Sequence, residues 1–169
     1  TTKVYYSDNL TSGVFNESLN VFEMFWASLF EYNSNLYLLG TNKPISFGGN
    51  GDLVLSKSTD DGLTWSSPKI VLSAPSATLE YVQTPTNVLF KDGYLVMATS
   101  IRDTTQSGFA NIDISLVVAD LTDLENPSNW SRLNDVVFDG TAFQNSLIYT
   151  NTPETKRPVL NGGVATKGF

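Results

Sequence analysis

The stretch Ser58-Thr59-Asp60-Asp61-Gly62-Leu63-Thr64-Trp65 places five characteristic residues at fixed spacing and predicts a tight turn between two strands. Asp60 can accept hydrogen bonds from backbone N–H groups within such a turn. Gly62 can adopt a backbone conformation that is closed to other residues. Ser58 and Thr64 can exchange hydroxyl hydrogen bonds across the hairpin, and Trp65 can bury a large aromatic surface. All these roles are structural, so we assign the stretch no catalytic function.

Short apolar runs bounded by turn residues lie on both sides of this stretch and predict antiparallel strands. Residues 28–32 lead through a polar turn into residues 36–40, and residues 87–90 lead through Lys91-Asp92-Gly93 into residues 94–98. An Asp-Gly pair between two apolar runs favours a hairpin, because glycine accepts the positive φ that such turns need. No segment shows a helical apolar stripe over three turns, so we expect an all-β fold.

The strand pattern repeats with a period of about 60 residues. Leu29-Phe30, Leu89-Phe90 and Ile148-Tyr149 recur at intervals of 60 and 59 residues. Trp65-Ser66 recurs as Trp130-Ser131 after the third strand of the next unit. Each unit therefore predicts four antiparallel strands, with a hairpin between the first two and a Trp after the third.

The stretch 58–65 fits the pattern Ser-x-Asp-x-Gly-x-Thr-Trp at every defined position and resembles the Asp-box, or bacterial neuraminidase (BNR) repeat, of sialidase-like β-propellers. The resemblance covers this motif and, more loosely, residues 21–150. It implies four-stranded antiparallel blades, with the Asp-box turn at the periphery and Trp65 between adjacent blades. The second unit lacks the box and keeps only Trp130. A β-sandwich with evenly spaced strands is the alternative fold, which the repeated Trp disfavours.

The repeat divides the chain into three expected parts: an N-terminal lead-in strand, a partial propeller and a connector. These parts are residues 1–20, residues 21–150 and residues 151–169. Within the propeller we expect blades at about 21–78 and 79–140, and the start of a third at 141–150.

Two blades and a starting strand do not close a ring, because propellers typically need four to eight blades. We therefore expect the chain to be an excerpt of a longer propeller that holds the remaining blades, a protomer of a homo-oligomeric ring, or a truncated variant. Residues Ala165-Thr-Lys-Gly-Phe169 resemble joints found in phage tail-fibre sequences. An ordinary glycine-containing hairpin is the alternative for this segment.

The composition excludes several classes of function. The chain contains no Cys and no His, which rules out within it a thiol nucleophile, a Ser-His-Asp triad and a zinc site built from Cys or His. A net charge of −7 and only ten Lys and Arg residues argue against a nucleic-acid partner. No stretch reaches the roughly 20 apolar residues that cross a bilayer, so we expect no membrane insertion. No loop spacing matches a calcium site, and we expect neither metal nor cofactor.

A sialidase-like resemblance implies a substrate carboxylate clamped by three arginines, and this chain has Arg102, Arg132 and Arg157. Arg132 follows a peripheral Trp and Arg157 lies in the connector, so we carry over no catalytic residue. Ligands of propellers usually meet the ends of the inner strands. The residues that the repeat predicts there, as candidates for ligand binding, are Glu23, Trp26, Glu80, Tyr81, Arg102 and Asp103, with Glu23 and Glu80 at nearly equivalent places.

These observations predict a non-catalytic glycan-recognition or structural module of a secreted or virion surface protein. Its partner would be a glycan or a cell-surface carbohydrate, met in an extracellular or virion-associated setting. The alternative is an excerpt of a sialidase-type glycoside hydrolase whose remaining catalytic groups lie outside the chain.

Overall fold

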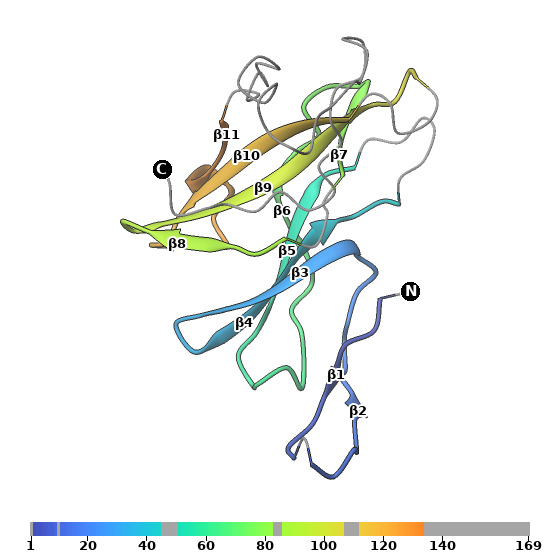
Figure 1. The fold of residues 1–169 in the computed structure, drawn as a ribbon, viewed down its shortest axis with the longest axis vertical. Coiled ribbons are helices and arrows are strands. Elements are labelled where there is room, and N and C mark those ends of the chain that lie inside the picture. The colour runs from blue at the N-terminus through green and yellow to red at the C-terminus, as the bar shows by residue number, and fades with distance from the viewer. Residues whose placement is uncertain (1, 10, 45–50, 83–85, 107–111, 134–169) are drawn as a thin grey trace, which may run out of the picture.

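A computed structural model describes residues 2–9, 11–44, 51–82, 86–106 and 112–133 (Figure 1). The expected start of a third blade, the connector and Arg157 lie outside these residues. In the described part of the chain all regular elements are strands, apart from one short 3₁₀ turn, η1 (Pro127–Asn129). The expectation of an all-β fold of antiparallel sheets is confirmed. The same residues include no helix long and apolar enough to cross a membrane.

The first sheet is a four-stranded antiparallel meander in chain order. Its strands are β3 (Phe25–Tyr32), β4 (Asn35–Thr41), β5 (Leu53–Ser58) and β6 (Lys69–Leu72). The hairpin between β3 and β4 turns on Asn33 and Ser34, which both have positive φ, at 49° and 57°. Positive φ at both central residues matches the right-handed twist of the flanking strands, so this polar pair closes the hairpin tightly.

The second sheet follows the order β11-β10-β9-β7, and β8 also pairs with β9. Its strands are β7 (Leu79–Val82), β8 (Leu89–Lys91), β9 (Tyr94–Asp103), β10 (Ile112–Asp120) and β11 (Trp130–Leu133). The sequence predicts one first strand at residues 87–90, whereas the structure has two pieces on the same edge. Strand β9 is ten residues long, so β8 pairs with its beginning and β7 with its end.

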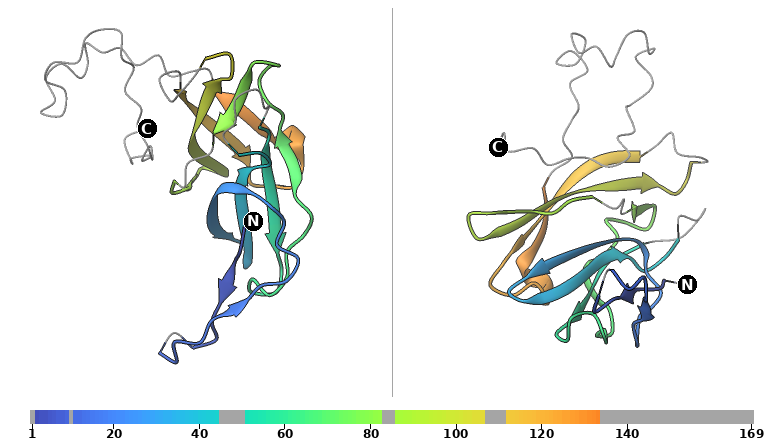
Figure 2. Two further views of the ribbon diagram at one scale, coloured as in Figure 1. Left: turned by 90° about the vertical axis from the view of Figure 1, so that its right-hand side faces the viewer. Right: turned by 60° about the horizontal axis from the view of Figure 1, so that its bottom comes forward.

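The main core lies between the two sheets, which Figures 1 and 2 show against each other. Alternate residues of each strand point into it, as the period of two in a strand requires. On β4 these are Tyr37 and Leu39, and on β9 Leu95 and Met97. Each is at most 5% exposed. The remaining buried members of this core are Phe30, Leu53, Leu55, Val71, Tyr81, Ile101, Val117, Ala119, Leu124 and Trp130.

A second, smaller core covers the face of the first sheet that points away from the second sheet. Trp65 packs there with Met24, Leu38 and Val54, and Val4 and Val21 of the N-terminal segment close over them. Trp65 therefore lies between the first sheet and the N-terminal segment, whereas Trp130 lies between the two sheets. Residues 1–20, expected to form a single lead-in strand, contain instead a ribbon of β1 (Tyr5–Tyr6) and β2 (Asn16–Glu17) that extends beyond the sheets (Figure 1).

The turn from Ser58 to Trp65 is organised by the carboxylate of Asp60. Its Oδ1 accepts hydrogen bonds from Ser58 Oγ at 2.8 Å and from the Thr64 N–H at 2.9 Å, and its Oδ2 accepts one from Thr64 Oγ1 at 2.5 Å. Ser58 Oγ in turn accepts the Gly62 N–H at 2.9 Å. The predicted bond between Ser58 and Thr64 is replaced by bonds to Asp60, because a carboxylate is the stronger acceptor. Gly62 has φ +86°, as its predicted role requires.

Replacing Asp60 by Ala should destabilise the fold at neutral pH by an amount that shrinks in acid. The bonds from Thr64, followed by that from Ser58, hold the pKa of Asp60 below its ordinary value of 3.8. A lowered pKa contributes stability that is present above the ordinary value and is lost as the pH falls through the lowered one. Thermal unfolding of both proteins from pH 7 to pH 2 measures this.

The control for this prediction is Asp61→Asn, because Asp61 is an exposed neighbour with positive φ that asparagine tolerates. We expect little change in its unfolding temperature. If the difference in unfolding temperature between wild type and Asp60→Ala stayed constant down to pH 2, the assigned role of the carboxylate would be contradicted.

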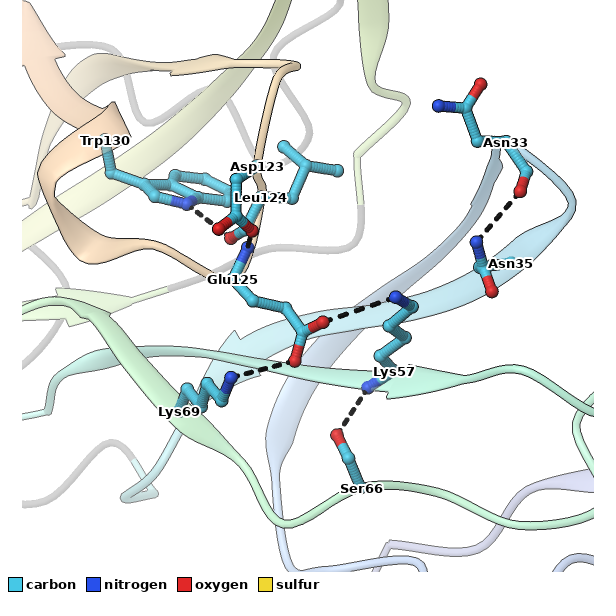
Figure 3. A network of polar contacts seen from close by, with 9 residues as sticks. All are labelled: Asn33, Asn35, Lys57, Ser66, Lys69, Asp123, Leu124, Glu125 and Trp130. Carbon is cyan, nitrogen blue, oxygen red and sulfur yellow. Dashed lines mark hydrogen bonds and ion pairs between the residues drawn. The ribbon is translucent and has the colours of Figure 1, made fainter.

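Polar contacts also join the two sheets at the hairpin side of the core (Figure 3). Glu125, in the turn after β10, accepts Lys57 Nζ at 3.3 Å and Lys69 Nζ at 3.0 Å from the first sheet. The bond from Lys69, together with that from Lys57, lowers the pKa of Glu125 despite its partial burial. The Thr86 N–H donates to Ser28 Oγ at 3.1 Å and makes a further link. The two sheets are thus held in one relative orientation.

Candidate functional site

The candidate site is the end of the two sheets where β3 and β7 begin, here called the strand-start end. At this end β3 starts with Phe25 paired to Thr41 of β4, and β7 starts with Leu79 paired to Asp103 of β9. Five of the six residues that the sequence predicts for ligand binding lie here, within strands β3, β7 and β9. The sixth, Glu23, lies two residues before the start of β3.

The two sheets touch closely at this end through Gly51. The Tyr81 N–H donates to Gly51 O at 3.0 Å. A Cβ atom added to Gly51 would lie 3.0 Å from Tyr81 O, 3.8 Å from Glu80 Cβ and 3.9 Å from Thr41 Cβ. A side chain at position 51 would therefore press on the backbone of β7. Glycine here lets the loop after β4 meet the first strand of the second sheet.

Glu80 and Arg102 form a buried ion pair at the strand-start end. They are direct cross-strand partners on β7 and β9, and Arg102 Nη1 donates to Glu80 Oε1 at 2.9 Å. Both side chains are 1% exposed. Burial raises the pKa of the Glu80 carboxyl, while the positive charges of Arg102 and Lys43 and a hydrogen bond from the Gly51 backbone oppose that rise. The pair ties β7 to β9 and does not present either charge to solvent.

Of the six residues predicted for ligand binding, Trp26 is the one whose aromatic side chain is exposed to solvent. The β3–β4 register shifts between Phe25 and Ser28, and Trp26 lies in this bulge with φ +55°. Its side chain is 49% exposed. A bulky residue in the left-handed region is an outlier that the surrounding structure must enforce, and such outliers cluster at functional sites.

The other predicted residues have different environments. Tyr81 is part of the core between the sheets. Glu23 is exposed in the segment before β3, so it does not share the buried setting of Glu80. Asp103 is half-buried, and its Oδ1 accepts the N–H and the hydroxyl of Thr105 at 2.9 and 2.6 Å. Those bonds hold its pKa below the ordinary value.

A polar clamp that the sequence does not reveal supports this end. Asn42 Nδ2 donates to Asp52 Oδ2 at 2.8 Å, and the Asp52 N–H donates back to Asn42 Oδ1 at 2.9 Å. Asp52 Oδ1 also accepts the Ala74 N–H at 2.8 Å. The clamp fixes the base of the loop between β4 and β5 to the segment that enters the second sheet. Its signal is only an Asn and an Asp at two strand ends, which sequence reading cannot pair.

No group of three or more Asp, Glu, His or Cys side chains within the described ranges is placed to hold a metal ion. The carboxylates of this end engage protein donors instead, as Glu80, Asp52 and Asp103 each do.

Comparison with known proteins gives structural matches alone. No family model matches the sequence, and no curated protein matches it. The structure is similar to an α-L-arabinofuranosidase from Lactobacillus brevis, with a TM-score of 0.50 and 18% identity over 70% of this chain and 38% of that chain. It also matches a Trypanosoma rangeli sialidase, with a TM-score of 0.47 and 14% identity over 78% of this chain and 22% of that chain.

A mutant of Trypanosoma rangeli sialidase that displays trans-sialidase activity matches with a TM-score of 0.47 and 15% identity, over 79% of this chain and 22% of that chain. The chain thus spans 38% of the length of the arabinofuranosidase and 22% of each sialidase. At these identities the likeness concerns the fold. The antiparallel four-strand meander and the sheet packed on it have the architecture of β-propeller blades.

Proposed function

We propose that this chain is a non-catalytic glycan-recognition module built on sialidase-like propeller blades, and that it binds carbohydrate at the strand-start end. The observation that carries the proposal is Trp26, a half-exposed indole held in a strained bulge at the start of β3. An indole offers a large, rigid apolar face at low conformational cost, which suits stacking on a sugar ring. The buried Glu80–Arg102 pair makes the same end of the sheets rigid.

The Asp-box resemblance of the Ser58–Trp65 turn supports the blade assignment, and the likeness of the C-terminal residues to tail-fibre joints supports a virion or extracellular setting. In that setting the partner would be a cell-surface carbohydrate. The remaining blades would come from further parts of a longer chain or from other copies of this one.

Replacing Trp26 by Ala should weaken glycan binding about 30-fold, since truncating a central Trp anchor costs roughly 2 kcal/mol or more. A glycan array on the full chain identifies the ligand, and isothermal titration compares the variants. Tyr94→Ala is the matched control, because Tyr94 is a 47% exposed aromatic residue at the opposite end of β9. An array without any bound glycan, or equal losses in both variants, would refute the proposal.

The second candidate is a piece of a glycoside hydrolase, which Glu80 favours. Its side chain is a buried carboxyl whose pKa is raised by burial, a feature that suits a general acid. The full chain would then release sugar from chromogenic arabinofuranosides or sialosides. Activity that Glu80→Gln abolishes, with the fold intact by circular dichroism, would favour the hydrolase over the binding module.

A further inference from the structure

We propose that the strand-start end accepts neutral sugars and disfavours sugars that carry a carboxylate. This inference rests on the proposed glycan-binding function and names its ligand class. It follows from the charges that the fold places at this end and from the state of the arginine among them.

Arg102 already forms a buried ion pair with Glu80. Recognition of a carboxylate by arginine uses the guanidinium fork, which donates two parallel hydrogen bonds to the anion. In this structure Nη1 of that fork donates to Glu80 Oε1, and the side chain is 1% exposed. A sugar carboxylate could reach this guanidinium only by opening a side chain that is 1% exposed, and it would then lie beside Glu80 as a second buried carboxylate, which is strongly unfavourable.

The remaining charges at this end are mostly negative. Among the described residues, carboxylates come from the segment before β3, from the residue before β5 and from the end of β9, and Lys43 after β4 contributes a positive charge. These three carboxylates belong to Glu23, Asp52 and Asp103. Lys3, near the β3 start through the bond between Thr2 and Met24, is engaged by Glu17 at 2.9 Å. An anionic ligand would meet net repulsion here.

In the sequence, the segments that join these strands add no charge. Residues 44–51, 73–78, 83–88 and 104–111 contain no charged residue. A neutral sugar can stack on Trp26 and hydrogen-bond to carboxylate oxygens through its hydroxyl groups. The carboxylate of an acidic sugar meets an arginine that is buried and paired, and it is repelled by the carboxylates of this end.

The test uses matched glycans that differ in one terminal acidic residue, lactose and sialyllactose, together with arabino-oligosaccharides. Binding to the full chain is followed by isothermal titration and by quenching of indole fluorescence, for wild type and for Trp26→Ala. We expect the neutral glycans to bind at least about tenfold more tightly than the sialylated one, with Trp26→Ala removing the difference.

The variant Glu23→Gln tests the role of charge independently, because Glu23 is exposed and lies outside the strands. This substitution should reduce the difference in affinity between neutral and acidic glycans without weakening the binding of the neutral ones. Equal or tighter binding of sialyllactose that depends on Trp26 would overturn the inference while the glycan-binding function stands. Absence of any binding that depends on Trp26 would overturn both.

Discussion

Replacing Arg102 by Met is expected to lower the free energy of unfolding by about 3–5 kcal/mol, because it leaves the Glu80 carboxylate buried without its cation. Chemical denaturation with urea at pH 7 measures the change. The double variant Glu80→Leu with Arg102→Met should recover much of the loss, since apolar residues of similar volume can replace a buried pair. A loss in the double variant as large as in the single one would show that packing, and not charge, is responsible.

The pH dependence of the single variant follows from the same pair. Burial already raises the pKa of Glu80 above its ordinary value of 4.5, and removing Arg102 removes a charge that lowers it. A raised carboxyl pKa favours the folded state at low pH, and that contribution is lost as the pH rises from 4.5 through the raised value. The stability of the Arg102→Met variant should therefore be closest to that of wild type in acid, and the difference in stability should grow as the pH rises.

Lys3→Met is the matched control for Arg102→Met. The Lys3–Glu17 pair has the same 2.9 Å separation, but its side chains are 51% and 50% exposed. Exposed pairs contribute little because water screens them. We expect Lys3→Met to change stability much less than Arg102→Met, and comparable losses would contradict the argument from burial.

Replacing Trp130 by Ala is expected to cost about 3–5 kcal/mol, the range for removing a large aromatic side chain from a core. Trp130 is 4% exposed, packs between the sheets and donates from Nε1 to Leu124 O at 2.8 Å. Its loss opens a cavity beneath the turn that carries Glu125 and so weakens the contact between the two sheets. Urea denaturation at pH 7 measures the change in the free energy of unfolding. A loss below about 1 kcal/mol would contradict the role of Trp130 in packing the two sheets together.

The two tryptophans that follow the third strands offer a finer comparison. Among the described residues, none accepts a hydrogen bond from Trp65 Nε1. Changing each Trp to Phe keeps an aromatic ring but removes the indole N–H. Trp130→Phe should therefore cost about 0.5–1.5 kcal/mol more than Trp65→Phe, the net value of one hydrogen bond. Equal costs would mean that the bond to Leu124 contributes nothing.

Local signals predicted the fold well. The Asp-Gly and Asn-Ser turns between apolar runs indicated both hairpins, and their positive φ values confirm the reason. The positions of Gly62 and Trp65 in the Ser58–Trp65 turn also follow from residue type. In each case the information lies within about eight residues, where backbone preference decides the structure.

The candidate site could be predicted only in outline. Sequence reading brought Glu80 and Arg102 to one end of the sheets, but it could not pair them, because their contact spans 22 residues and depends on the register of β7 against β9. That register also splits the first strand of the second unit into β7 and β8. The clamp of Asn42 and Asp52 and the bulge at Trp26 depend likewise on how neighbouring strands end.

The bulge at Trp26 has a consequence for how this protein can be altered. Its φ of +55° suits glycine, and a half-exposed indole gains little from burial, so folding alone gives no reason for a tryptophan at this position. The residue that would stabilise the chain most and the residue that would hold a ligand best are different here. Selection for heat resistance in the laboratory should therefore remove this side chain early, and selection for adhesion should keep it.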